Sequence, residues 1–258
     1  MHFKDWLFFK RQGLAQRLGR TIEFPAAPFR MPANKSKHDY RHRATSPLAK
    51  LFFEHEGRGV TKWVDYLDVY DRHLAPYRGQ AVRMLEIGVL KGGSLEVWRR
   101  YFGPDAVLYG VDIEPACADR VDAPNQVRIG SQDDPAFLRR VVEEMGGLDV
   151  VLDDGSHRGD HQMASFRALF PLLGEGGLYM IEDLHTSYWP GVFSGGYRRR
   201  GTGIELVKQL IDDVHSWYHD KGDSLGMRDS IRGIHLYDSI VAIEKGAKER
   251  PVVIEHGM

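Results

Sequence analysis

The fold of this chain can be read outward from the stretch Val82-Arg-Met-Leu-Glu-Ile-Gly-Val-Leu-Lys-Gly-Gly-Ser94, which joins a buried strand to a helix through glycines. Residues 82–87 form a short apolar run typical of a strand, and a helical pattern begins at Ser94. Glycine between the two lets a ligand approach bare backbone. The spacing differs from the Gly-x-Gly-x-x-Gly pattern of nicotinamide and flavin sites, so a pyrophosphate at the helix N-terminus is the weaker interpretation.

The alternation of strand and helix continues along the chain. A helix is predicted over Val60–Leu74, and further strands are predicted at Val107–Val111, Gln126–Ile129, Leu148–Leu152 and Gly177–Ile181. Strands that are linked by helices form a parallel sheet with helices on both faces. Residues 233–244 read as two antiparallel strands joined at Asp238-Ser239. We therefore expect an α/β protein with a doubly wound sheet, mostly parallel, that ends in an antiparallel hairpin.

The composition excludes several classes of protein. The 258 residues carry 35 Lys and Arg, 36 Asp and Glu and one cysteine, Cys117, with 42% hydrophobic side chains. Such a chain is globular rather than disordered, collagenous or coiled-coil. A single cysteine cannot form an internal disulfide, and no apolar run approaches the length of a membrane span. A cytoplasmic location is expected.

The charge is unevenly distributed. Residues 1–50 hold eleven Lys and Arg against three acidic residues, so this part carries +8 and the remainder −9. Residues 1–20 could form an amphipathic helix on an anionic membrane surface, or a helix docked on the rest of the chain or on a second subunit. Four prolines in residues 24–47 indicate an extended linker. We expect a basic N-terminal segment at 1–50, a globular domain at 51–258, and a homo-oligomer, for which the basic segment is an element that could be exchanged between subunits. No nucleic-acid-binding motif accompanies the basic residues.

Polar residues follow the carboxyl ends of the predicted strands, where ligands bind in such sheets. Asp112 ends the second strand and could accept hydrogen bonds from both ribose hydroxyls of an adenosine-bearing cofactor, or could simply cap the next turn. The residues expected to contact this cofactor are Glu86, Gly88, Gly92, Ser94, Asp112, Asp133 and Asp153.

Two further aspartates indicate a metal site. Asp154 and Asp183 end neighbouring strands, whose backbones lie about 4.8 Å apart. A pair of carboxylates without cysteine ligands suits Mg²⁺ better than Zn²⁺. His157 follows Asp154 by three residues and is the expected general base for a hydroxyl group. Contact of Glu86 or Glu182 with the metal is left open by the sequence.

The motifs Leu85-Glu-Ile-Gly-Val89, Asp153-Asp-Gly-Ser-His157 and Ile181-Glu-Asp183 resemble those of the metal-dependent, S-adenosylmethionine-dependent sugar O-methyltransferases. This family includes enzymes that methylate 6-deoxyhexoses on macrolides and related rhamnosyl O-methyltransferases. The resemblance implies a Rossmann-like class I methyltransferase fold, S-adenosylmethionine and Mg²⁺ as cofactors, and methylation of a sugar hydroxyl on a glycosylated natural product or glycolipid, as in antibiotic biosynthesis.

Three residues near the last strand are expected to contact the acceptor, namely His185, Tyr188 and Trp189. Flat aromatic faces pack on sugar rings, although aromatic residues also form cores. Two other functions are compatible with the sequence. The chain could be a hydroxylase-like protein of an antibiotic pathway, or a non-catalytic scaffold that has kept the cofactor site.

Overall fold

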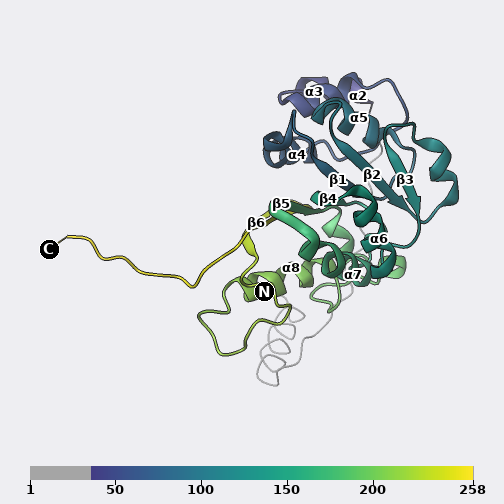
Figure 1. The fold of residues 1–258 in the computed structure, drawn as a ribbon. Coiled ribbons are helices and arrows are strands. Elements are labelled where there is room, and N and C mark those ends of the chain that lie inside the picture. Colours follow the sequence, from purple (N-terminus) through teal and green to yellow (C-terminus); the bar gives the residue numbers. More distant parts are fainter. Residues whose placement is uncertain (1–35, 258) are drawn as a thin grey trace, which may run out of the picture.

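A seven-stranded sheet in the order β3-β2-β1-β4-β5-β7-β6 crosses the molecule (Figure 1). The computed structural model describes residues 36–257. The strands are β1 (Arg83–Ile87), β2 (Val107–Asp112), β3 (Gln126–Ile129), β4 (Leu148–Asp153), β5 (Leu173–Ile181), β6 (Ile231–Leu236) and β7 (Val241–Lys245). The first five are parallel, and β7 runs antiparallel to both β5 and β6. This is the class I methyltransferase topology that the strand pattern and the resemblance predicted.

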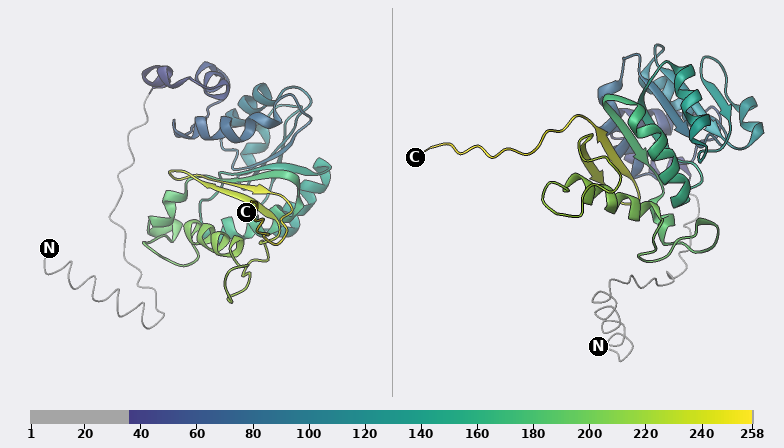
Figure 2. Two further views of the ribbon diagram at one scale, coloured as in Figure 1. Left: turned by 90° about the vertical axis from the view of Figure 1, so that its left-hand side faces the viewer. Right: turned by 60° about the horizontal axis from the view of Figure 1, so that its bottom comes forward.

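Helices cover both faces of the sheet (Figure 2). The α-helices are α2 (Lys37–Tyr40), α3 (Pro47–Glu54), α4 (Tyr66–Leu74), α5 (Gly93–Phe102), α6 (Pro135–Met145), α7 (Gly159–Leu169) and α8 (Gly203–Val214). The 3₁₀ helices are η1 (Arg41–Arg43), η2 (Ala75–Tyr77), η3 (Pro115–Arg120), η4 (Phe170–Leu172), η5 (Leu184–Tyr188) and η6 (Gly191–Phe193). Asp134 caps α6, since its carboxylate accepts from the backbone N–H groups of Ala136 and Phe137.

Neighbouring residues of the central strands point into two different cores. Met84 and Val150 face α3, α4 and α5, whereas Leu85 and Val151 face α6, α7 and α8. Side chains alternate across a strand, so a strand buried on both faces must be apolar throughout. This requirement explains why apolar runs, rather than alternating patterns, marked the central strands in the sequence.

The C-terminal hairpin forms as predicted. β6 pairs with β7, and the turn between them contains Ser239. The carbonyl of Ser239 accepts hydrogen bonds from the N–H of Leu184 and the hydroxyl of Tyr66. The hairpin tip therefore lies against the segment that follows β5, close to the predicted site.

Two predictions about the N-terminal half were wrong. The helix expected from Val60 begins only at Tyr66, and residues 60–65 form an irregular segment. The linker expected to be extended through residue 47 contains helical turns at α2 and η1. α3 passes through residue 50, where the boundary of the basic segment was predicted, and its Leu48, Ala49 and Phe53 are buried in the core.

The amphipathic helix predicted for residues 1–20 lies outside the described residues. Among the residues that are described, no helix is both long and apolar enough to cross a bilayer.

Candidate active site

The carboxyl ends of β4 and β5 bring Asp154, His157 and Asp183 together. One potential ligand atom of each lies within 4.8 Å of those of the other two. Nε2 of His157 is 3.6 Å from Oδ2 of Asp183 and 3.9 Å from Oδ1 of Asp154. All three side chains are partly exposed and line a cleft of about 440 Å³.

Backbone geometry fixes this cluster. β4 and β5 are in parallel register through Asp153 and Ile181, so the next residues of each strand leave the sheet side by side. His157 and Asp183 both adopt left-handed backbone conformations, with φ of 55° and 54°. Such conformations cost roughly 1–3 kcal/mol outside glycine and gather at functional sites. The hydroxyl of Thr186 holds His157 by donating to its carbonyl at 3.1 Å.

Two aromatic residues orient the carboxylate of Asp183. Its Oδ1 accepts hydrogen bonds from Nε1 of Trp63 at 3.0 Å and from the hydroxyl of Tyr66 at 2.9 Å. Both donors come from the irregular segment and the first residue of α4. The other oxygen, Oδ2, faces His157. Asp183 thus presents one oxygen to the cleft while the other is held from behind.

Lys62 is the residue that the sequence analysis missed. Its Nζ lies 2.5 Å from Oδ2 of Asp154 and 2.7 Å from Oε1 of Glu182, and only 4% of the side chain is exposed. Glu86 Oε1 is 3.9 Å away. Apolar residues in 60–70 have helical spacing, so the sequence did not reveal that Lys62 lies in an irregular segment. The one available signal was a lone lysine among apolar residues.

Burial and the neighbouring charges shift the pKa of Lys62 in opposite directions. Burial alone would lower the pKa of Lys62, but the carboxylates of Asp154, Glu182 and Glu86 outweigh it and raise that pKa above its usual value. Burial raises the pKa of Glu86 to about 7. Burial also raises the pKa of Glu182, despite its contact with Lys62. The ammonium therefore stays charged and compensates the acidic residues beneath the cleft.

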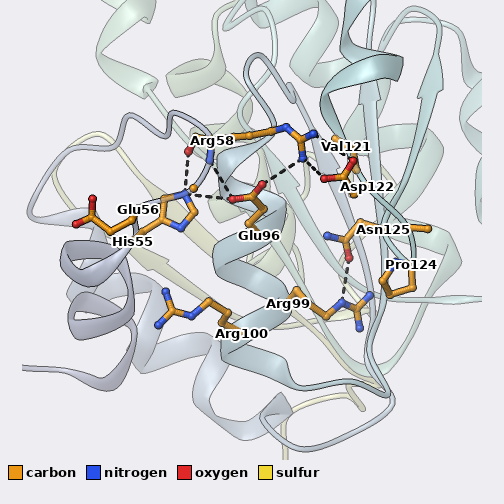
Figure 3. Close-up of a pocket in the computed structure, with 13 residues that line it drawn as sticks. His55, Glu56, Arg58, Glu96, Arg99, Arg100, Val121, Asp122, Pro124 and Asn125 are labelled. Atoms are coloured by element: carbon orange, nitrogen blue, oxygen red, sulfur yellow. Dashed lines mark hydrogen bonds and ion pairs between the residues drawn. The ribbon is translucent and has the colours of Figure 1, made fainter.

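Ion pairs hold the segment that precedes Lys62 against α5 (Figure 3). The Arg58 guanidinium contacts Asp122 at 2.6 Å and Glu96 at 3.2 Å, and the Arg58 backbone N–H donates to Glu96 at 3.0 Å. Nε2 of His55 lies 2.8 Å from the Arg58 carbonyl. These residues line a second pocket of about 350 Å³. Gly92 also lines this second pocket, which shares no residue with the cleft that holds His157.

Two of the residues predicted to contact a cofactor line the cleft, namely Gly88 and Asp112. Oδ2 of Asp112 accepts from the N–H groups of Val89 and Leu90, and Oδ1 accepts from that of Glu114. Burial would raise the pKa of Asp112, but these backbone donors outweigh it and lower that pKa. Asp112 caps the turn, as the alternative interpretation held, while Oδ1 retains a lone pair for a ligand hydroxyl.

The other residues predicted to contact the cofactor are not among those that line the cleft; they lie behind or beside it. Glu86 is fully buried and accepts from Oγ of Ser94 at 2.7 Å. Gly92 precedes α5 with φ of 83°, and a Cβ there would lie 2.1 Å from the Arg120 carbonyl, so this glycine serves the turn.

Asp153 and Asp133 support the cleft from below and from its rim. Asp153 is fully buried and accepts from Ser165 Oγ at 2.6 Å and from Gln132 Nε2 at 3.1 Å. Gln132 lines the cleft, whereas Asp153 does not. Asp153 therefore influences the cleft by holding the side chain of Gln132. Asp133 accepts from the Ser131 hydroxyl and lies 3.5 Å from Nε2 of His161.

A row of aromatic rings borders the cluster on the side predicted for the acceptor. The His185 ring packs edge-on against Trp63 and Trp189, with centroids at 5.5 and 4.6 Å. Phe193 continues the row and lies 5.8 Å from Trp189 and 6.4 Å from His157. Tyr188 ends η5 and is 38% exposed. Phe193 is a member of this row that the sequence did not reveal.

The donor set fits a hard divalent cation. Two carboxylates from adjacent strand ends face each other across His157, and the Asp183 oxygen that faces the cleft is not the one held by Trp63 and Tyr66. Oxygen ligands of this kind suit Mg²⁺, which keeps waters in its remaining positions. Nδ1 of His157 is buried without a hydrogen-bond partner, so only its Nε2 is directed toward the two carboxylates.

Comparison with protein families agrees with this geometry. A family model described as a methyltransferase domain matches residues 85–184, from β1 to the residue after Asp183. The matched range therefore includes both predicted metal ligands and His157.

Individual relatives are sugar methyltransferases. The L-olivosyl-oleandolide 3-O-methyltransferase of Streptomyces antibioticus is 41% identical over 82% of this chain and 58% of its own length. The mycinamicin VI 2''-O-methyltransferase of Micromonospora griseorubida is 42% identical over 70% of this chain and 48% of its own length. The chain spans about half the length of the curated relatives that it matches.

A solved structure of a methyltransferase is also similar to this chain. The MycE methyltransferase from the mycinamycin biosynthetic pathway, in complex with Mg, SAH and mycinamycin VI, superposes with a TM-score of 0.68 and 32% identity. The match covers 88% of this chain and 67% of that chain.

Proposed function

Since this chain belongs to the family of sugar O-methyltransferases of antibiotic pathways, we propose that it methylates a sugar hydroxyl of a glycosylated natural product or glycolipid. S-adenosylmethionine is the methyl donor in this proposal. The cofactor occupies the cleft beside Gly88 and Asp112. The names of the relatives and the SAH in the MycE structure support this assignment.

In the proposed reaction, His157 removes the proton from the acceptor hydroxyl. The new O–CH₃ bond forms as the S–CH₃ bond breaks, S-adenosylhomocysteine leaves, and the proton stays on Nε2 of His157. Nε2 lies 3.9 Å from Asp154 and 3.6 Å from Asp183, so the base stands beside the two carboxylates where the acceptor hydroxyl is expected. The rest of the task is to hold the oxygen in line with the sulfonium methyl group.

Asp154 and Asp183 would hold Mg²⁺ in this proposal. When bound, the ion supplies Lewis-acid polarisation that lowers the pKa of an acceptor hydroxyl. Lys62, which also donates to Glu182, fixes Asp154 from below. Trp63 and Tyr66 fix Asp183 from behind. Both ligands are therefore oriented before any ion binds, which favours binding because little ordering remains to be done.

The aromatic row provides the acceptor surface. His185, Trp189 and Phe193 present ring edges and faces beside His157, and a sugar ring packs well on such surfaces. Tyr188 is exposed at the end of the same segment, where an aglycone would extend into solvent.

The observation that carries the proposal is the meeting of Asp154, His157 and Asp183 in one cleft. The experiment is a mass-spectrometric screen for a gain of about 14 Da on candidate glycosides, with S-adenosylmethionine and Mg²⁺ supplied. A product that disappears after chelation supports the whole proposal. Methyl transfer that survives chelation would overturn the metal assignment. Failure of the chain to bind S-adenosylmethionine in calorimetry would overturn the methyltransferase assignment, and binding without transfer to any glycoside would favour a scaffold.

A further inference from the structure

A second group of metal-ligating side chains lies on the hairpin side of α4, outside the cleft. His73, His235 and Glu244 each offer one ligand atom within 4.8 Å of those of the other two. Nε2 of His235 is 3.0 Å from Oε1 of Glu244, and the rings of His73 and His235 lie 4.8 Å apart. None of these residues lines the cleft or touches the cluster around His157.

Sheet register brings two of the three together. His235 of β6 pairs with Ala242 of β7, and Gly233 pairs with Glu244. Glu244 is therefore the diagonal neighbour of His235 on the same face of the hairpin. His73 comes from the last turn of α4, which packs over this face, and its Nε2 lies 2.9 Å from the Tyr237 hydroxyl.

From this arrangement we propose that His73, His235 and Glu244 form a site for a Zn²⁺-class transition metal. Two imidazoles and one carboxylate are a ligand set that zinc accepts, with a fourth position left to water. A tetrahedral site with bonds of about 2.0–2.2 Å places its ligand atoms roughly 3.3–3.6 Å apart. Small side-chain rotations bring atoms that are already within 4.8 Å to that spacing.

The absence of a side chain at Gly233 leaves room for an ion beside His235 and Glu244. A Cβ at Gly233 would lie 3.3 Å from Nε2 of His235 and 3.4 Å from Oε2 of Glu244, so a larger residue would crowd both donors. The side chains of His235 and Glu244 are 43% and 38% exposed, which gives an ion and its water access from solvent.

The bound metal would join α4 to the hairpin. Tyr66, at the other end of α4, donates to both Asp183 and the Ser239 carbonyl in the hairpin turn. His73 lies seven residues further along, about 10 Å by helix geometry. An ion at the proposed site would therefore fix the same two elements that meet again behind Asp183, and should raise the stability of the folded chain.

Calorimetry and thermal unfolding of the full, untagged chain test this site. The protein is stripped with a chelator and titrated with Zn²⁺ in excess Mg²⁺, which occupies oxygen-rich sites without competing for imidazoles. One Zn²⁺ per chain should bind and raise the melting temperature. H73Q and E244Q, which keep the size of the side chain, should each weaken binding by more than about tenfold. Gly233→Ala, which leaves all three ligands in place, should weaken it as well.

The control is His157→Asn, which removes the imidazole that lies between Asp154 and Asp183 in the cleft. It should leave the tight Zn²⁺ site unchanged. Co²⁺ provides a spectroscopic readout, since a tetrahedral nitrogen and oxygen site gives intense visible absorption that H73Q should abolish. Absence of Zn²⁺ binding by a folded chain in excess Mg²⁺ would overturn the proposal. So would binding that H73Q and E244Q leave intact while His157→Asn removes it.

Discussion

Lys62 and Asp154 form an ion pair of 2.5 Å across 92 residues of sequence, between an irregular segment and the end of β4. Because Lys62 also contacts Glu182, one buried ammonium compensates two carboxylates directly behind the cleft. A cation at Asp154 and Asp183 would add positive charge to the same acidic group. We therefore expect Lys62 to stabilise the chain without metal and to reduce the attraction of the acidic cluster for Mg²⁺.

Replacement of Lys62 separates its effect on the stability of the chain from its effect on Mg²⁺ binding. Lys62→Met keeps the length of the side chain but leaves Asp154 and Glu182 without their partner. Removal of one partner of a buried ion pair typically costs about 3–5 kcal/mol. We expect such a loss in the free energy of unfolding in a chelator, and partial recovery in Mg²⁺, both measured by urea denaturation.

Lys50→Met is the matched control, because Lys50 is exposed on α3. It should change stability little under either condition. If Lys62→Met were as stable as the control in the chelator, the compensating role of Lys62 would be refuted.

The strands and three of the site residues could be predicted because their signals are local. Apolar runs mark strands that are buried on both faces, and Asp154, His157 and Asp183 follow those strands directly. Lys62 could not be predicted, because its partners are 92 and 120 residues away in the sequence. The helical spacing of Val64, Leu67 and Tyr70 led us to extend the helix over residues 60–65, which are irregular.

Sequence alone could not show which of the predicted cofactor residues face the cleft and which face the interior. A polar residue at a strand end can face the cleft or the interior, and one residue of register decides between them. Asp153 and Asp154 illustrate this, because the first is fully buried and the second lines the cleft. The Glu86 and Ser94 pair likewise depends on the path of the glycine turn, which the sequence does not specify.

The base assignment predicts a defect in turnover rather than in cofactor affinity. His157→Asn keeps a residue that tolerates a φ of 55° but removes the imidazole. Loss of a general base lowers kcat by about 10²–10⁴-fold. S-adenosylmethionine affinity, measured by calorimetry, should stay nearly constant. His219→Asn, at an exposed position, is the control, and a kcat of His157→Asn equal to that of the control would rule out His157 as the base.

The donors behind Asp183 should influence metal affinity. Trp63→Phe and Tyr66→Phe each remove one hydrogen bond to Oδ1 and leave an aromatic ring at the position. Loss of a partner of a metal ligand weakens binding by about 10–100-fold. Calorimetric titration with Mg²⁺ measures this effect. Tyr218→Phe, at a 71% exposed position, should bind Mg²⁺ normally, and equal affinity in all three variants would contradict the orienting role.

Asp112 should make stability depend on pH in the acid range. Its folded pKa is lowered, so its contribution is complete above the unfolded value of about 3.9 and is lost as pH falls through the folded value. Asp112→Asn should be less stable at pH 7 by about 1 kcal/mol, since solvent screens this half-buried group. The difference should shrink as pH falls below the unfolded value of about 3.9. If the difference in free energy of unfolding between the two proteins, measured by urea denaturation, stayed constant from pH 7 to pH 2.5, the charge-based explanation would be disproved.

Gly88 holds the ends of β1 and β4 close together, and its replacement should damage the cleft more than backbone strain alone predicts. Its φ is +93°, and a Cβ would lie 2.1 Å from the Asp154 carbonyl. Gly79 offers a matched control, since it has φ of +70° with open space around it. Gly79→Ala should cost the strain of about 1–3 kcal/mol, whereas Gly88→Ala should add about 1–3 kcal/mol of overpacking and also weaken Mg²⁺ binding by displacing Asp154. Equal losses in urea denaturation, with Mg²⁺ affinity unchanged in both variants, would show that the close approach at Gly88 does not position Asp154.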